Sequence, residues 1–225
     1  MKIENGESLL FIGDSITDCG RTRPVGNRTG LGDGYVSFVD SLLASSYPEL
    51  NIRVFNTGIS GNRIIDLNTR WQADVLDLAP DWLTVMIGIN DVWRKFDNHL
   101  DPNQVTIDKF KNIYRKLLEQ TRQKLKGLVL ISPYFIEPNL SDPMRKKMDS
   151  YSRVVEQLAH EYDAIFVNVQ VAFDHYLVHR PSQSLCNDRV HPNKTGHMII
   201  TKSFLTSMEF NWNKVNSLQV KHGNR

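Results

Sequence analysis

A serine, a histidine and an aspartate in this chain have the residue types that nucleophilic catalysis requires. Ser15 stands in a Gly-Asp-Ser segment directly after a short apolar run, and a serine hydroxyl is a weak nucleophile until a base takes its proton. His191 is the natural base, because the pKa of imidazole lies near the working pH. Asp188 precedes His191 by three residues and can bond the other ring nitrogen. The pattern predicts a catalytic triad for acyl transfer.

Acyl transfer also needs hydrogen-bond donors aimed at the oxyanion that develops on the substrate. We expect three donors here: the backbone N–H groups of Ser15 and Gly61 and the side-chain amide of Asn90. Each residue follows the end of an apolar run, and the three runs are successive along the chain. The sequence therefore predicts an oxyanion hole built by three neighbouring segments.

Residues beside these segments are candidates for binding the substrate, namely Asp14, Trp93 and Tyr134. Trp93, Tyr134 and Phe135 follow apolar runs and could line a groove, although each alone is equally typical of core packing. Asp14 and Asp91 are carboxylates next to the predicted centre. For both, hydrogen bonding within the loops is favoured over proton transfer.

Other nucleophiles are disfavoured. Ser60 lies in Gly-Ile-Ser-Gly-Asn, and the nucleophile elbow of an α/β-hydrolase requires Gly-x-Ser-x-Gly, so the final Asn breaks the motif. Cys19 and Cys186 could each form a pair with a histidine, but neither directly follows an apolar run as Ser15 does. We interpret both cysteines as bystander thiols.

No metal or cofactor is expected. Two cysteines are too few for a Cys-only zinc site, and His175 and His179 lack the Glu of a zinc-protease helix. Gly30, Gly32 and Gly34 match no phosphate-binding pattern and indicate a flexible loop near the site.

Hydrophobic patterning predicts the elements that must position these residues. Short, continuous apolar runs typical of strands buried on both faces of a parallel sheet are Leu9–Gly13, Ile52–Asn56, Trp82–Ile87, Leu128–Ile131 and Ala164–Val167. Apolar residues at helical spacing lie within 36–43, 67–78, 107–117 and 151–158, and a last helix is expected over 195–207. The alternation predicts a three-layer α/β/α sandwich with a five-stranded parallel sheet. Ligands bind such sheets beyond the carboxyl ends of the strands, where all the candidate residues can meet.

Length and composition favour one domain. The chain has 225 residues, 40% hydrophobic and 23% charged, and a formal net charge of +2. Such a small net charge gives no indication of a nucleic-acid or membrane partner. The N-terminal residues lack the apolar run of a secretory signal, so we expect a cytoplasmic protein. A single domain over 1–225 is predicted, with its core at about 8–207 and no assignment for 211–225.

The candidate residues lie in blocks that resemble the GDSL or SGNH hydrolases. That family carries a Ser in Gly-Asp-Ser, a Gly, an Asn in Gly-x-Asn-Asp and a His in Asp-x-x-His. The matching residues here are Ser15, Gly61, Asn90 and His191, with Asp188 as the third triad member. Ile16 replaces the leucine of the first block, which is a mild apolar exchange. The resemblance covers about residues 8 to 207 and implies a flavodoxin-like sheet, no metal, and removal of small acyl groups from carbohydrates or lipids.

Longer runs resemble a bacterial subgroup of this family that contains intracellular acetylxylan esterases. They are residues 11–20, 86–93 and 142–145. The subgroup implies O-acetyl groups on xylose units as the substrate and a homo-oligomer of unknown size. The leading hypothesis is therefore a serine esterase that deacetylates xylose or xylo-oligosaccharides. A lysophospholipase or thioesterase of the same fold and a non-catalytic flavodoxin-like binding module remain the alternatives.

Overall fold

A central sheet organises the computed structural model, which describes residues 1–97 and 104–214 of the chain. Residues 215–225, most of the unassigned C-terminal segment, lie outside the described part. Five parallel strands form the sheet's core: β1 (Ser8–Gly13), β3 (Arg53–Asn56), β4 (Trp82–Met86), β5 (Gly127–Ile131) and β6 (Ile165–Val167). Each predicted strand is confirmed, with boundaries that differ by one residue at most.

The sheet has one strand more than predicted. The two-residue strand β2 (Gly26–Asn27) pairs antiparallel with the end of β3, where Gly26 faces Asn56 and Asn27 faces Phe55. Two residues are too few to produce a hydrophobic period, so sequence patterning does not reveal such an edge strand.

Strand order places the candidate residues at one position in the sheet. The order is β2-β3-β1-β4-β5-β6, so β1 lies between β3 and β4. The chain leaves β1 toward one edge and later crosses to the other side. In doubly wound sheets this reversal point is where ligands bind, at the carboxyl ends of the strands. The loops after β1, β3 and β4 all leave the sheet there.

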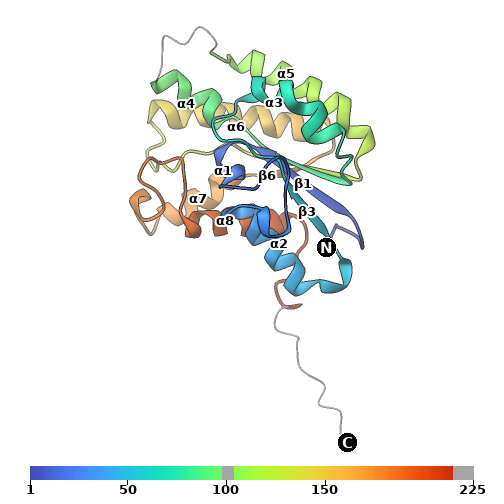
Figure 1. Ribbon diagram of the computed structural model, residues 1–225. Coiled ribbons are helices and arrows are strands. Elements are labelled where there is room, and N and C mark those ends of the chain that lie inside the picture. Colours follow the sequence, from blue (N-terminus) through green and yellow to red (C-terminus); the bar gives the residue numbers. More distant parts are fainter. Residues whose placement is uncertain (98–103, 215–225) are drawn as a thin grey trace, which may run out of the picture.

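Helices cover both faces of the sheet, which confirms the three-layer prediction (Figure 1). One layer contains α2 (Tyr35–Ser46), α7 (Val169–Leu177) and α8 (Lys194–Ser207). The other contains α3 (Ile64–Trp71), α4 (Ile89–Asp97), α5 (Ile107–Thr121) and α6 (Pro143–Glu161). A π-helical turn, η3 (Gln72–Leu76), continues α3. The short 3₁₀ turns are η1 (Arg28–Gly30), η2 (Pro48–Leu50), η4 (Arg122–Lys124) and η5 (Ser182–Ser184).

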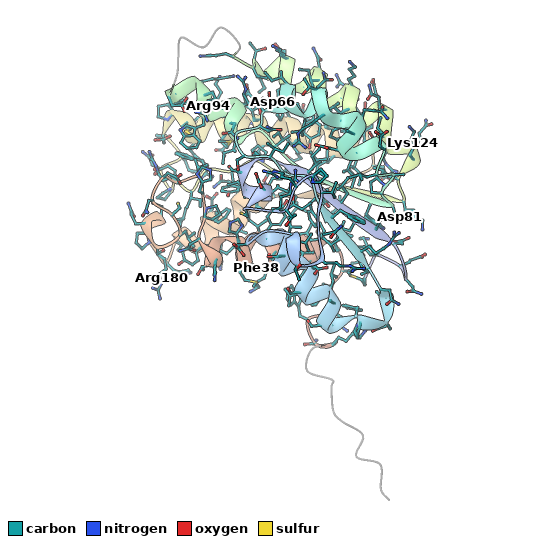
Figure 2. The ribbon with its side chains drawn as sticks, in the orientation of Figure 1. Phe38, Asp66, Asp81, Arg94, Lys124 and Arg180 are labelled. Atoms are coloured by element: carbon teal, nitrogen blue, oxygen red, sulfur yellow. The ribbon has the colours of Figure 1, made fainter. Side chains whose placement is uncertain are left out.

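Apolar side chains fill the space between the sheet and both helix layers (Figure 2). One aromatic cluster connects β1 to two helices of one layer. The Phe11 ring on β1 lies 5.6 Å from the Tyr35 ring on α2 and 5.2 Å from the Phe204 ring on α8. Aromatic pairs of this kind contribute roughly 0.5–1.5 kcal/mol each beyond area burial. Among the described residues, no helix is long and apolar enough to cross a bilayer.

Candidate active site

Ser15 begins a four-residue helix, α1 (Ser15–Asp18), at the end of β1. Asp14 caps this helix, because its Oδ1 atom accepts a hydrogen bond from the Ile16 amide at 3.0 Å. Gly13 allows the tight turn: a Cβ there would lie 2.3 Å from the Met86 carbonyl oxygen of the neighbouring strand. Ser15 is therefore held at the rim of the sheet by the abrupt change from strand to helix.

A continuous chain of hydrogen bonds joins the three predicted triad residues. The Ser15 hydroxyl lies 2.8 Å from His191 Nε2, and His191 Nδ1 lies 2.6 Å from Asp188 Oδ2. An ionised carboxylate can only accept, so Nδ1 carries the proton and Nε2 is left to accept from Ser15. Partial burial raises the pKa of Asp188, but the hydrogen bonds it accepts from His191 and Val190 outweigh this and lower the pKa below its ordinary value. The histidine is thus oriented as a base toward the serine.

The loop after β5 fixes the segment that carries Asp188 and His191. The Tyr134 hydroxyl donates to the Val190 carbonyl oxygen at 3.0 Å, and the Ile136 amide donates to the Arg189 carbonyl oxygen at 2.9 Å. Tyr134 is only 1% exposed. Its observed partner is therefore the backbone under the triad loop, and its side chain does not line an open groove.

The loop after β3 is fastened to α1. Asp18 Oδ2 accepts hydrogen bonds from the Ser60 amide at 2.9 Å, from the Ser60 hydroxyl at 3.0 Å and from Arg23 at 2.6 Å. A Cβ on Gly58 would lie 2.5 Å from the Asp18 amide nitrogen, so glycine permits this close packing. The rival nucleophile Ser60 has its hydroxyl engaged with a carboxylate.

The three predicted oxyanion donors follow three neighbouring strands, β1, β3 and β4. The Asn90 side chain, in the first turn of α4, donates to the Asn62 carbonyl oxygen at 3.1 Å and has a second N–H to offer. Gly61 adopts a φ of +81°, in the left-handed region that favours glycine. The backbone amides of Ser15 and Gly61 donate to no acceptor within residues 1–97 and 104–214.

Two carboxylates at the rim are buried. Burial raises the pKa of Asp14 to about 7, and it raises the pKa of Asp91 to about 7 as well. Asp91 accepts from the Ile64 amide and thereby connects α4 to α3. Asp14, predicted as a substrate contact, is 1% exposed and caps α1, so the contacts that the structure shows for it are internal.

Sequence reasoning missed a contact between Cys19 and His197. The Cys19 sulfur lies 3.3 Å from His197 Nε2, and His197 Nδ1 accepts from the Tyr35 amide at 3.2 Å. Nδ1 is therefore the acceptor, which places the ring proton on Nε2, facing the sulfur. Burial lowers the pKa of His197 to about 4 and raises the pKa of Cys19 to about 12. The pair resembles a catalytic dyad, but its protonation leaves no base for the thiol.

A cleft adjoins the triad at Trp93. The Trp93 ring lies 5.7 Å from the His191 ring and lines a cleft of about 260 Å³. Of Asp14, Trp93 and Tyr134, Trp93 lines this cleft, and so does Phe135, which the sequence also offers as a groove residue. In the described part of the chain, no three His, Cys, Asp or Glu side chains are grouped as a metal site.

The fold and the hydrogen-bonded Ser-His-Asp chain are those of a serine hydrolase built on a flavodoxin-like sheet. A family comparison matches residues 11–199 to the GDSL-like lipase/acylhydrolase family, and the chain belongs to this family. The resemblance drawn from the sequence blocks is thereby confirmed, as is the prediction of an ester-hydrolysing enzyme.

Similar proteins share nearly the whole chain. An acetylxylan esterase of Geobacillus stearothermophilus is 49% identical over 215 residues, which are 94% of this chain and 98% of that protein. The crystal structure of this esterase, Axe2, matches with a TM-score of 0.93. LAE5, an α/β hydrolase enzyme from a Lake Arreo metagenome, is 41% identical, covers 93% of this chain and 98% of its own, and matches with a TM-score of 0.91. Solved structures of Axe2 also include catalytic mutants in which a serine, an aspartate and a histidine are each replaced by alanine.

Proposed function

We propose that this protein is a serine esterase that removes acetyl groups from xylose or xylo-oligosaccharides. One observation carries the proposal: the unbroken hydrogen-bonded chain from the Ser15 hydroxyl through His191 to Asp188. Membership of the acylhydrolase family and 49% identity to an acetylxylan esterase support it.

The proposed reaction has two steps. His191 Nε2 takes the Ser15 proton while Oγ attacks the acetyl carbonyl carbon, and the carbonyl oxygen becomes an oxyanion. The amides of Ser15 and Gly61 and the side chain of Asn90 would stabilise this charge. His191 then returns the proton to the sugar oxygen as the ester bond breaks, which leaves an acetylated Ser15. Water, deprotonated by His191, then attacks the acetyl carbon. The bond to Ser15 Oγ breaks, His191 returns the proton to Oγ, and acetate leaves.

Asp188 has a positioning and an electrostatic role in this scheme. Its carboxylate accepts from His191 Nδ1 and, through its other oxygen, from the His191 amide at 2.8 Å. These two bonds hold the ring in one orientation and stabilise the positive imidazolium that forms in both steps.

The main alternative is a lysophospholipase or thioesterase of the same fold. A long acyl chain requires a continuous apolar channel, but the cleft beside the triad contains Asp97, Asp142 and Arg189. The family includes lipases, so acyl length must be measured. A non-catalytic binding module would not require a base placed 2.8 Å from the Ser15 hydroxyl.

The test is a panel of p-nitrophenyl esters from acetyl to octanoyl, together with acetylated xylose and a lysophospholipid. Each methylene buried in a lipid channel contributes ~0.8 kcal/mol, or about fourfold in affinity, so a lipase improves steeply with chain length. We expect good turnover of p-nitrophenyl acetate, poor turnover of the butyrate ester and almost none of the octanoate ester. The kcat/KM for acetylated xylose should be far higher than that for the lysophospholipid. A profile that peaks at eight carbons would refute the carbohydrate substrate. A folded Ser15→Ala variant that still hydrolyses p-nitrophenyl acetate would refute the assignment of Ser15 as the nucleophile.

A homo-oligomer, a cytoplasmic location and the lack of a nucleic-acid partner belong to the same proposal and stay predictions. Size-exclusion chromatography with light scattering tests the first of them.

A further inference from the structure

The cleft beside the triad has a composition that the deacetylation step does not require. It lies between the second half of α4, the start of α6 and the loop that carries Asp188 and His191, and its volume is about 260 Å³. Its walls include Trp93, Phe96, Asp97, Phe135, Asp142 and Arg189. Trp93 borders both the cleft and the His191 ring, so a ligand in the cleft would lie next to the reacting centre.

Three aromatic rings, together with Pro143 and Met144, form the apolar part of the cleft. Phe135 is buried, and the Arg189 guanidinium covers its ring at 4.8 Å. Phe96 lies on the last turn of α4 and remains 37% exposed although it is a large apolar side chain. Aromatic faces combined with a few placed polar groups are typical of small-molecule sites, and such faces can pack against the C–H faces of a sugar ring.

The charged groups of the cleft are already compensated. Arg189 pairs with Glu137 at 2.5 Å and lies 3.8 Å from Asp142. Asp142 also caps α6 through its other oxygen. Asp97 pairs with Arg94 at 2.5 Å. Among the described lining residues, each charged group has a partner of opposite charge, so they offer hydrogen-bond donors and acceptors without an uncompensated charge. This suits a neutral ligand rich in hydroxyl groups better than an anion or a lipid tail.

We propose that this cleft is a subsite for a second sugar ring of an acetylated oligosaccharide, next to the ring whose acetyl group is attacked by Ser15. The inference rests on the proposed function and adds to it a reason for preferring oligosaccharides to single sugars. The volume lies just below the range of drug-sized pockets, about 300–1,000 Å³, a size that suits a single sugar ring. In this subsite the Phe96 side chain packs against the second sugar ring. The charged groups of Arg189, Asp97 and Asp142 form hydrogen bonds with the hydroxyl groups of that ring.

The test compares kcat/KM for xylose and xylobiose that carry one acetyl group at the same ring position, with p-nitrophenyl acetate as a substrate that has one ring and no second sugar. We expect the wild-type protein to prefer the disaccharide by about three- to tenfold, the range of one good aromatic contact. Phe96→Ala and Phe96→Leu should reduce this ratio to near one, with little change for p-nitrophenyl acetate. Phe96→Tyr, which keeps the ring, should retain the preference.

Leu78→Ala is the matched control, because Leu78 is also a 37% exposed apolar side chain but does not line the cleft. It should leave the ratio unchanged. Equal kcat/KM for the two acetylated sugars in the wild-type protein would overturn the subsite and leave the esterase intact. A preference for the disaccharide that survives Phe96→Ala would show that the subsite does not lie in this cleft. Turnover of p-nitrophenyl acetate without turnover of either acetylated sugar would instead overturn the proposed carbohydrate substrate, and the subsite with it.

Discussion

Asp18 receives two hydrogen bonds from one residue, Ser60: the backbone amide donates at 2.9 Å and the hydroxyl at 3.0 Å, both to Oδ2. Asp18 ends the helix that starts at Ser15, and Ser60 directly precedes Gly61. A single carboxylate thus couples the turn that carries the nucleophile to the turn that carries a proposed oxyanion donor. Burial raises the pKa of Asp18, but the bonds from Arg23 and Ser60 outweigh it, so the pKa is lowered and the carboxylate is ionised.

Asp18→Ala should therefore lower kcat for p-nitrophenyl acetate by roughly 10²-fold with little change in KM. Without the carboxylate, the turn that carries the proposed donor Gly61 is no longer fixed, and this donor acts on charge that develops in the transition state. Asp18→Asn keeps an acceptor oxygen and should lose less. Glu156→Ala, an exposed change on α6, is the control and should have no effect. If Asp18→Ala raises KM and leaves kcat unchanged, Asp18 does not position the oxyanion donor.

Asp188→Asn should reduce kcat by up to ~10⁴, because an amide at this position favours the wrong tautomer of His191. The protein should remain folded, since the Asp188 side chain is substantially exposed. Steady-state kinetics and circular dichroism on the same sample measure both quantities. A loss smaller than about tenfold would show that another group orients the imidazole.

Asn90→Ala should lower kcat by roughly 10²–10³ with a smaller effect on KM, because its free N–H is expected to act on the developing oxyanion. The comparison is made on p-nitrophenyl acetate, which lacks a sugar and so reports the chemical step. An increase in KM at constant kcat would make Asn90 a ground-state binding residue.

Thiol reagents should not inactivate the enzyme. Burial raises the pKa of Cys19 to about 12, and it raises the pKa of Cys186 as well, so both remain protonated at pH 8. We expect full activity after iodoacetamide treatment and complete loss with a phosphonofluoridate, which mass spectrometry should locate on Ser15. Inactivation in proportion to the alkylation of Cys19 would contradict the conclusion that Cys19 and His197 form an unreactive pair.

Asp91→Asn should stabilise the protein at alkaline pH. Burial raises the pKa of Asp91 from its ordinary value of 3.8 to about 7. Between these values the folded state binds more protons than the unfolded state, so the Asp91 contribution to the free energy of unfolding falls as the pH rises. The amide oxygen of Asn can still accept from Ile64 and needs no proton.

The variant should gain ~1–3 kcal/mol over wild type at pH 8 and almost nothing at pH 4, as measured by urea denaturation at both values. An equal difference at the two pH values would show that the effect of Asp91 does not arise from its ionisation.

The amino-acid sequence was sufficient to predict the five parallel strands and the edge of the sheet where the candidate site lies. Strands buried on both faces are continuous apolar runs, and residues that follow parallel strands must meet at one rim. The sequence also predicted that Ser15, Asp188 and His191 act together, because a nucleophile, a base and a carboxylate are the residue types that acyl transfer requires.

Other features depend on contacts between residues far apart in the chain, which local patterns do not encode. The two residues of β2 gain their strand conformation from pairing with β3. Tyr134 is a residue type that often lines a groove, but packing places it under the loop that carries Asp188 and His191. The hydrogen bond between Cys19 and His197 joins residues at opposite ends of the chain. Burial and long-range partners set the roles of these side chains, and both arise when the three layers assemble.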